Sequence, residues 1–412
     1  MIRMVMSGNE REGMLSLKGI MLSVLTILVL ALSSQRAIAA DPKQIYDQAT
    51  NALYNLDFST AERSYETLTH DYPENPDYWN ALASAVWLKI TFDQQKLNIE
   101  SFAGSSLGTK DSRDTVNPVD EKRLRDTLAI AIQKADAILS KNPNDIQALY
   151  AKGISNGTLA SFEATAKRSY VAAHSKARIA KDLHERVLKL DPSFNDARMA
   201  IGAYDYVVGV IPGFVRFVLS PFGVRSAGKD IGIQELETAA AKGKKASTDA
   251  KMILTVVYTR EKQYEKAIKL FEELHTRYPG NFLMELAEGS VYGKMQKYAD
   301  AERVYQDVLS QIRAKKNGYD RLRQARVLYA LGTNAVDGQQ FDKASEAFKQ
   351  VISANDGTPN EKGRSYLWLG KLFDSMKDRG KALEQYDALL ALNCSADLKA
   401  EAQRYKRRPY GE

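Results

Sequence analysis

The chain has 412 residues, of which 44% are hydrophobic and 26% charged, with 11 prolines, 25 glycines and one cysteine. This composition is typical of a soluble helical protein and excludes a disordered or collagen-like chain. The formal charge of +7 is spread over the whole length, without the concentrated basic face of a nucleic-acid-binding protein, so we expect no nucleic-acid partner.

The N-terminus has the layout of a secretory signal. Residues 20–32 are almost purely apolar, Lys18 precedes them, and an Ala-Ile-Ala site at 37–39 follows. The apolar stretch is short for a membrane span, which needs about 20 residues. We therefore predict that residues 1–40 are a cleaved signal peptide and that the protein is exported to the periplasm or cell envelope of a bacterium. The alternatives are an uncleaved N-terminal anchor and full secretion.

Residues 41–247 carry a degenerate pattern of paired helices. The first unit is Phe58, Ala61, Tyr65 and Leu68 before Pro73, and weaker units begin near Ala131 and Ala180. A stretch rich in Gly, Ser, Asp and Lys at 102–119 breaks the pattern and predicts an inserted surface loop. The alternative is a loop that contacts a partner.

A second break, at 206–223, is apolar except for Arg216 and contains two prolines and three glycines, which disfavours a membrane span. We favour an irregular buried segment here, because an exposed patch this apolar promotes aggregation. The alternative is a segment that lies in a membrane interface, with Phe214, Phe217 and Phe222 as the membrane contacts.

The pattern becomes regular over residues 248–392. Its alanines recur after 34, 43 and 38 residues, each followed four residues later by an aromatic residue on the same helical face, in the pairs Ala267–Phe271, Ala301–Tyr305, Ala344–Phe348 and Ala382–Tyr386. Glycines such as Gly289, Gly332 and Gly370 precede these pairs. We expect two helices per unit, a close approach at the small residues, and an aromatic side chain in the seam between units. The extra residues of the longer spacing, at 315–320, are expected in a loop.

This scheme resembles the tetratricopeptide repeat (TPR) family, of the exported bacterial type. The resemblance implies an all-α fold in which helix-turn-helix units stack into a right-handed superhelical solenoid, with an irregular N-terminal half. Residues 393–412 are expected to form a capping helix and a tail that frays from residue 406. A further local resemblance, to the Iml2/TTC39 family of TPR-containing proteins, rests on Phe222, Gly228, Asp230, Gly232 and Leu236.

The sequence contains no pattern that supports catalysis. Residues 223–229 have the glycine and lysine spacing of a phosphate-binding loop, but Asp230 stands where Ser or Thr must hold magnesium. None of His70, His174, His184 and His275 has a partner at metal-ligand spacing, and His184 occupies the aromatic seam position of its unit. We therefore predict a protein that is not an enzyme and has no metal or cofactor, with His184 in the core.

The resemblance implies that the first helix of each unit lines a concave face. In this sequence that face is mixed basic and apolar, with the residues Arg260, Lys294, Arg326, Tyr329, Arg364, Leu367 and Lys371. Such a set suits a protein or peptide segment with acidic residues, anchored by Tyr329 and Leu367. The predicted function is a non-catalytic scaffold or adaptor, and the alternative is a lipid- or membrane-surface-binding protein that uses residues 206–223. The sequence does not predict the oligomeric state.

Overall fold

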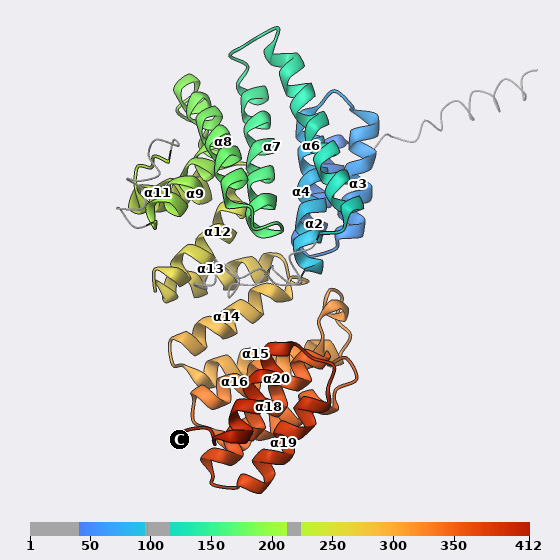
Figure 1. Ribbon diagram of the computed structural model, residues 1–412. Coiled ribbons are helices and arrows are strands. Elements are labelled where there is room, and N and C mark those ends of the chain that lie inside the picture. Colours follow the sequence, from blue (N-terminus) through green and yellow to red (C-terminus); the bar gives the residue numbers. More distant parts are fainter. Residues whose placement is uncertain (1–40, 95–96, 98–115, 212–223) are drawn as a thin grey trace, which may run out of the picture. The chain divides into compact units, whose positions relative to one another are not determined.

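The computed structural model describes residues 41–94, 97, 116–211 and 224–412, and these form α-helices and short 3-10 turns without any strand (Figure 1). The prediction of an all-α fold is confirmed. The signal peptide, most of the 102–119 loop, and Phe214, Phe217 and Phe222 lie outside the described residues. Two compact units are present, residues 1–47 and residues 48–412. Of the first, only residues 41–47 are described.

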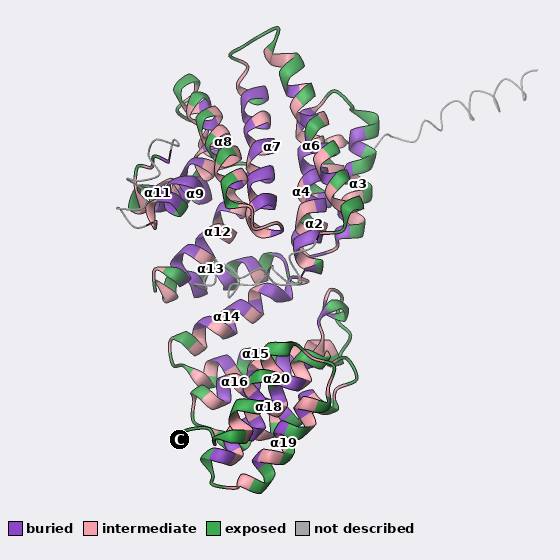
Figure 2. Cartoon of the chain, in the orientation of Figure 1, coloured by how far each residue is buried: buried purple, intermediate pink, exposed green. Residues whose placement is uncertain are grey.

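Within the second unit, each helix packs mainly against its neighbours in sequence, as in a solenoid of helical pairs. The helices that precede the regular repeats are α2 (Pro42–Tyr54), α3 (Phe58–Asp71), α4 (Pro76–Asp93), α6 (Pro118–Leu139), α7 (Ile146–Thr165), α8 (Tyr170–Leu190), α9 (Arg198–Gly209) and α11 (Lys229–Lys242). The regular repeats contain α12 (Ser247–Arg260), α13 (Tyr264–Arg277), α14 (Phe282–Lys294), α15 (Tyr298–Arg313), α16 (Gln324–Asp337), α17 (Phe341–Ser353), α18 (Pro359–Ser375) and α19 (Arg379–Ala391). The chain ends with α20 (Ala396–Arg407), and Figure 2 shows buried residues along the length of central helices such as α7.

The turn inside each regular pair has one repeated geometry. A residue with positive φ stands two positions before the second helix, at Lys262, Gln296, Gln339 and Lys377. The next amide then donates to a carbonyl of the first helix, for example from Gln340 to Ala335 over 2.8 Å, and this satisfies a carbonyl that the helix end leaves unpaired. Leu56 and Arg168 have the same positive φ before α3 and α8. The irregular half therefore uses the same turn as the regular repeats.

The seams between paired helices are built as the sequence predicts, with glycine on the first helix beneath a ring from the second. A Cβ atom added to Gly332 would lie 2.5 Å from Cε1 of Phe348, and one added to Gly289 would lie 2.6 Å from Cε1 of Tyr305. Gly370 lies beneath Tyr386 in the same way. The rings of Phe348 and Tyr386 are fully buried, which is possible because no side chain separates them from the opposite helix.

The α2–α3 turn packs against the regular repeats, through contacts between residues 195 to 227 positions apart in sequence. Asn281 Nδ2 donates to the Tyr54 carbonyl at 2.8 Å, Gly280 N donates to Asn55 Oδ1 at 2.8 Å, and the Tyr54 hydroxyl donates to Asp249 at 2.8 Å. The rings of Tyr54 and Tyr278 are 4.9 Å apart. The described helices from residue 48 onward therefore form one compact unit, and the irregular half is not a separate domain.

We expect replacement of Asn281 by alanine to lower the free energy of unfolding by about 2 kcal/mol. The change removes the N-cap acceptor of α14 and leaves the buried Tyr54 carbonyl without its donor. Asn75→Ala is the matched control, because Asn75 caps only its own helix, and it should cost about 1 kcal/mol. Urea unfolding followed by circular dichroism measures both. Equal midpoints for the two variants would show that the contact with the α2–α3 turn adds no stability.

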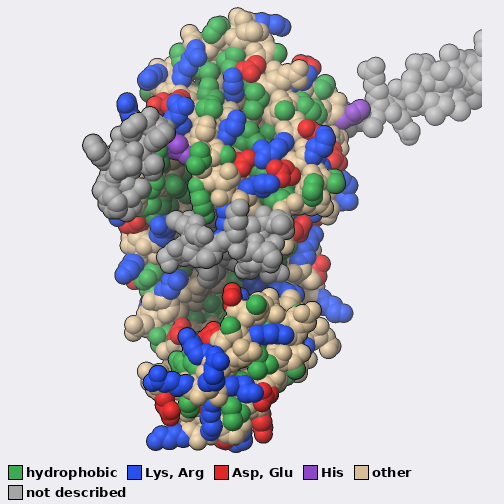
Figure 3. Space-filling view, viewed as in Figure 1, with side chains coloured by type: hydrophobic (Ala, Val, Ile, Leu, Met, Phe, Trp, Pro, Cys, Tyr) green, Lys and Arg blue, Asp and Glu red, His purple; other side chains and the backbone are tan. Residues whose placement is uncertain are grey.

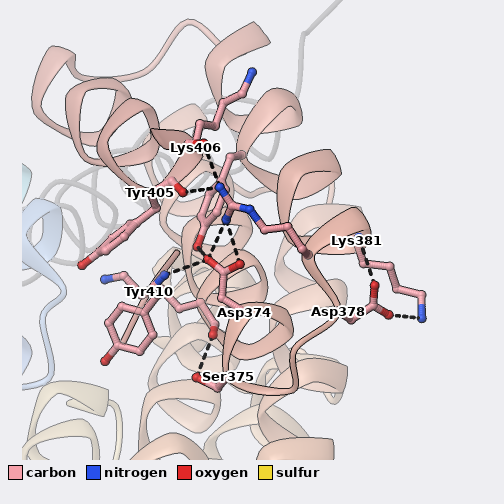
Figure 4. A network of polar contacts seen from close by, with 10 residues as sticks. Asp374, Ser375, Asp378, Lys381, Tyr405, Lys406 and Tyr410 are labelled. Atoms are coloured by element: carbon pink, nitrogen blue, oxygen red, sulfur yellow. Dashed lines mark hydrogen bonds and ion pairs between the residues drawn. The ribbon is translucent and has the colours of Figure 1, made fainter. Parts of the chain in front are cut away.

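The segment that follows α19 differs from the expectation in one respect. The prediction that the chain frays from residue 406 is wrong, because α20 continues to Arg407 and the Tyr410 amide then donates to Asp374 Oδ2 at 2.9 Å (Figure 4). Arg379 also donates to the Tyr405 and Lys406 carbonyls at 2.8 and 2.7 Å. The last turn of α20 is therefore held by an arginine that satisfies its unpaired carbonyl groups.

Candidate partner-binding surface

The seven residues predicted for the concave face lie on the first helices α12, α14, α16 and α18 and differ widely in exposure. Arg260, Lys294 and Arg364 are exposed, whereas Arg326 and Tyr329 are half-buried. The Tyr329 hydroxyl accepts from Trp368 Nε1 at 3.3 Å, and burial raises the pKa of Tyr329. Tyr329 therefore has a structural contact of its own and presents only part of its ring.

Leu367 and Lys371 are covered by the chain itself. Leu367 is 5% exposed and belongs to a core cluster with Tyr386 and Ala402. Lys371 Nζ pairs with Glu401 at 2.8 Å. Because α20 packs over this part of α18, Leu367 is a core residue, which corrects the expectation that it anchors a partner.

Arg326 lies in a small cavity that we call the arginine pocket. The cavity has a volume of about 180 Å³ and is lined by Phe92, Asp93, Leu97, Phe282, Leu283, Arg321, Leu322, Arg323 and Arg326. Three arginines and one aspartate give this lining a formal charge of +3 − 1 = +2. Since a water molecule takes about 30 Å³ of liquid volume, the cavity has room for a carboxylate or a short side chain.

The arginine pocket exists because three distant segments meet there. The end of α4 provides Phe92, and the start of α14 provides Phe282, whose rings are 6.1 Å apart. Tyr319 in the inserted turn is fully buried and its hydroxyl donates to Glu285 of α14. The insertion at 315–320 is thus more than a surface loop, because its buried tyrosine holds the following residues, 321–326, against α14.

The cations of the pocket differ in their contacts. Arg321 donates to the Leu56 carbonyl, and Arg323 Nη2 donates to Glu361 Oε1 at 2.8 Å. Asp93 pairs with Lys89 at 2.8 Å, which lowers its repulsion of any incoming anion. The sequence pointed only to Arg326. Arg321 and Arg323 were missed because they follow an insertion that does not fit the repeat pattern. The one signal that could have found them is the presence of three arginines within residues 321–326.

A metal site, a titrating histidine and a membrane span are the other features to consider in the described residues. No group of His, Cys, Asp or Glu side chains in this part of the chain could hold a metal ion. His184 is fully buried, as predicted, and burial lowers its pKa to about 4. Among the described helices, none has both the length and the apolar character that a membrane span needs.

Comparisons with known proteins define the class of protein. Family models described as tetratricopeptide repeat match residues 46–90 and 329–397, residues 249–281, and residues 282–356. The chain is a tetratricopeptide repeat protein. Repeats of this family generally mediate protein–protein contacts and are typically non-catalytic, so the chain is a protein-interaction scaffold in that general sense. A comparison with curated proteins gave no significant match.

Three solved structures illustrate the similarity in fold. Yeast Tom70 is 13% identical, with 90% of this chain and 89% of that chain covered, at a TM-score of 0.36. A chain in the structure of the APC/C hetero-tetramer Cut9–Hcn1 is 14% identical, with 91% of this chain and 57% of that chain covered, at a TM-score of 0.46. Pseudomonas aeruginosa pilF is 18% identical, with 57% and 90% covered and a TM-score of 0.34. Similarity at this level carries no argument about the partner of this chain.

Proposed function

We propose that the protein is an exported scaffold of a bacterial cell envelope that holds an acidic protein segment, with one carboxylate of that segment in the arginine pocket. The observation that supports this most directly is the clustering of Arg321, Arg323 and Arg326 around one small cavity. The location rests on the signal-like layout of residues 1–40.

The chemistry of the arginine pocket fits a carboxylate next to an apolar group. A guanidinium presents planar N–H donors that match both oxygens of a carboxylate, and such charge-assisted bonds are the strong ones. Phe92, Phe282, Leu283 and Leu322 form the apolar part of the lining, where a neighbouring methyl or methylene group can pack. The exposed cations Arg260, Lys294 and Arg364 on the other first helices add an attraction that speeds the approach of an acidic partner.

Charge reversal at Arg326 is expected to reduce capture of the partner at least tenfold, because an unpaired carboxylate would then face the partner's own. Residues 41–412 would be immobilised, exposed to solubilised cell envelopes, and the bound proteins quantified by mass spectrometry. Arg303→Glu is the matched control, since it makes the same charge change on an exposed residue of the second helix α15. Arg364→Glu would show whether the exposed cations contribute.

Equal capture by the Arg326→Glu variant, the Arg303→Glu variant and the unchanged chain would contradict the pocket as the contact. The location is tested separately by fractionating cells that express the full chain. A protein found with the cytoplasmic fraction, with residues 1–40 retained, would contradict export.

The alternative is a membrane-surface protein that uses residues 206–223. One described residue favours it: Val207, at the start of this segment, is 60% exposed although it is apolar. Co-sedimentation with liposomes tests the idea. Binding that is unchanged in a Phe214→Asp/Phe217→Asp variant would exclude the segment as the membrane contact.

A further inference from the structure

A short segment of the chain itself, residues 408–412, lies against the last repeat, where it contacts α18 and α20. After α20 ends, Arg408 has an extended backbone, with φ −136° and ψ 122°, as expected for the residue before a proline. The Tyr410 amide donates to Asp374 of α18, and the Tyr410 ring meets the Tyr405 ring edge-on at 5.4 Å (Figure 4). The Glu412 amide donates to the Pro409 carbonyl at 3.4 Å and Gly411 has a φ of 92°, so residues 409–412 form a turn that Tyr410 attaches to α18.

The surface beneath the segment consists of aromatic rings around Lys371, whose charge is paired with a carboxylate. Lys371 Nζ lies 4.8 Å from the ring centroid of Trp368, 5.2 Å from that of Tyr405 and 5.5 Å from that of Tyr410. Its ammonium group also pairs with Glu401. A cation over an aromatic face is attractive, so the Tyr410 ring gains a specific place above Lys371.

The Asp374 carboxylate, which accepts the backbone hydrogen bond of the segment, is held in place by other residues. The Asp374 carboxylate is fully buried and accepts from Arg379 Nη1 at 2.8 and 3.1 Å and from the Tyr386 hydroxyl at 2.8 Å. These contacts fix the carboxylate without help from the segment. Asp374 therefore remains oriented for a backbone N–H after Tyr410 leaves.

The segment itself is held lightly. Arg408, Gly411 and Glu412 are exposed, and Tyr410 is 37% exposed. Figure 3 shows Lys and Arg side chains gathering over the end of the molecule that the C-terminal helices form. In α20 and the segment, Arg404, Arg407 and Arg408 are exposed. Beyond Arg408, the segment is attached to the helices through Tyr410, by its amide bond to Asp374 and by the contacts of its ring with Tyr405 and Lys371. A segment attached through one residue is displaceable.

We propose that Trp368, Lys371 and Asp374 form a binding surface for a peptide turn with a Pro-aromatic pair, and that Pro409-Tyr410 occupies it until a partner with the same chemistry displaces it. This surface would recognise a peptide by its aromatic ring and its backbone N–H. The charges of the surface add little selectivity, because Lys371 is paired with Glu401 and Asp374 with Arg379. This proposal does not depend on the arginine pocket, so an experiment can contradict one of the two proposals without contradicting the other.

The test uses a labelled peptide of residues 406–412, KRRPYGE, and a chain that ends at Arg407. The covalent link to α20 gives the segment an effective concentration on the order of 1 mM at this surface. If the segment is bound about nine-tenths of the time, the free peptide has a Kd on the order of 0.1 mM. We expect the shortened chain to bind the peptide with such a Kd by fluorescence anisotropy. The unchanged chain should bind it at least tenfold more weakly, because its own segment competes.

Two further samples keep the result clear. A Tyr410→Ala variant of the full chain keeps the contacts of α20 with the other helices, and it should also bind the peptide. A peptide with the same replacement should bind the shortened chain at least tenfold more weakly. Circular dichroism confirms that the chains are folded. The proposal is overturned if the folded shortened chain and the Tyr410→Ala variant bind neither peptide, or bind both peptides equally.

Discussion

Replacement of Gly332 by alanine is expected to lower the free energy of unfolding by about 3 kcal/mol, at the upper end of the cost of overpacking a core. The new methyl group would lie 2.5 Å from Cε1 and 2.8 Å from Cδ1 of Phe348, well inside any real carbon contact. Phe348 is fully buried and its ring stacks 6.2 Å from that of Trp368, so it has little room to move. The repeat can accept the methyl group only by separating α16 from α17.

Gly157→Ala is the matched control for this prediction. Gly157 also lies inside a first helix, α7, but a Cβ atom there would be 4.0 Å from its nearest neighbour, the Cβ of Ala180. Alanine is favoured over glycine in a helix by about 1 kcal/mol, so this variant should be slightly stabilised. Urea unfolding curves give both midpoints. A Gly332→Ala chain as stable as the unchanged one would mean that the seam is loose.

The second large effect is a dependence of the free energy of unfolding on pH, which we expect from His184. This residue occupies the seam position that Phe or Tyr occupies in the regular repeats. A Cβ atom on Gly153 would lie 2.5 Å from its Nε2, and its ring is 5.2 Å from that of Tyr150. Burial lowers the pKa of His184 from 6.5 to about 4, opposed by a contact with the Tyr150 backbone. The folded protein therefore binds a proton at this site far less readily than the unfolded chain does.

The sign of the pH effect follows from this difference. Between pH 6.5 and pH 4 the unfolded chain carries the proton and the folded protein does not, so the free energy of unfolding falls as the pH falls. The 2.5-unit difference amounts to about 3 kcal/mol, all of it lost by pH 4 and none of it lost above pH 7. Below pH 4 this group adds no further change.

His184→Phe should remove that loss, because phenylalanine fills the same seam without titrating. We expect the variant and the unchanged chain to have similar urea midpoints at pH 7.5 and to differ by about 2 to 3 kcal/mol in favour of the variant near pH 4. The difference between the two curves isolates His184 from carboxylates that titrate in the same range. Parallel pH profiles would show that the pKa of His184 is the same in the folded and the unfolded chain.

The positions that set the seams were readable from the sequence. Ala344 and Phe348 lie one turn apart on one helical face, and Gly332 precedes them, so any helical pair that buries this face must place the ring against the glycine. His184 was placed in the core by the same reasoning. The positive-φ turns were not readable, because Lys262, Gln296, Gln339 and Lys377 are not residues that favour that conformation. The fixed spacing of the two helices imposes it on whichever residue stands there.

What the sequence determined by itself is therefore the repeat: which faces are buried, where the helices pair, and that Arg326 lies on a first helix. These depend on contacts between residues close in sequence, which a local pattern records. Only the tertiary structure decided which of the predicted surface residues are accessible. The α2–α3 turn and the buried Tyr319 bring Arg321 and Arg323 beside Arg326, and α20 covers Leu367 and Lys371. Such contacts join segments far apart in sequence, and no periodic pattern records them.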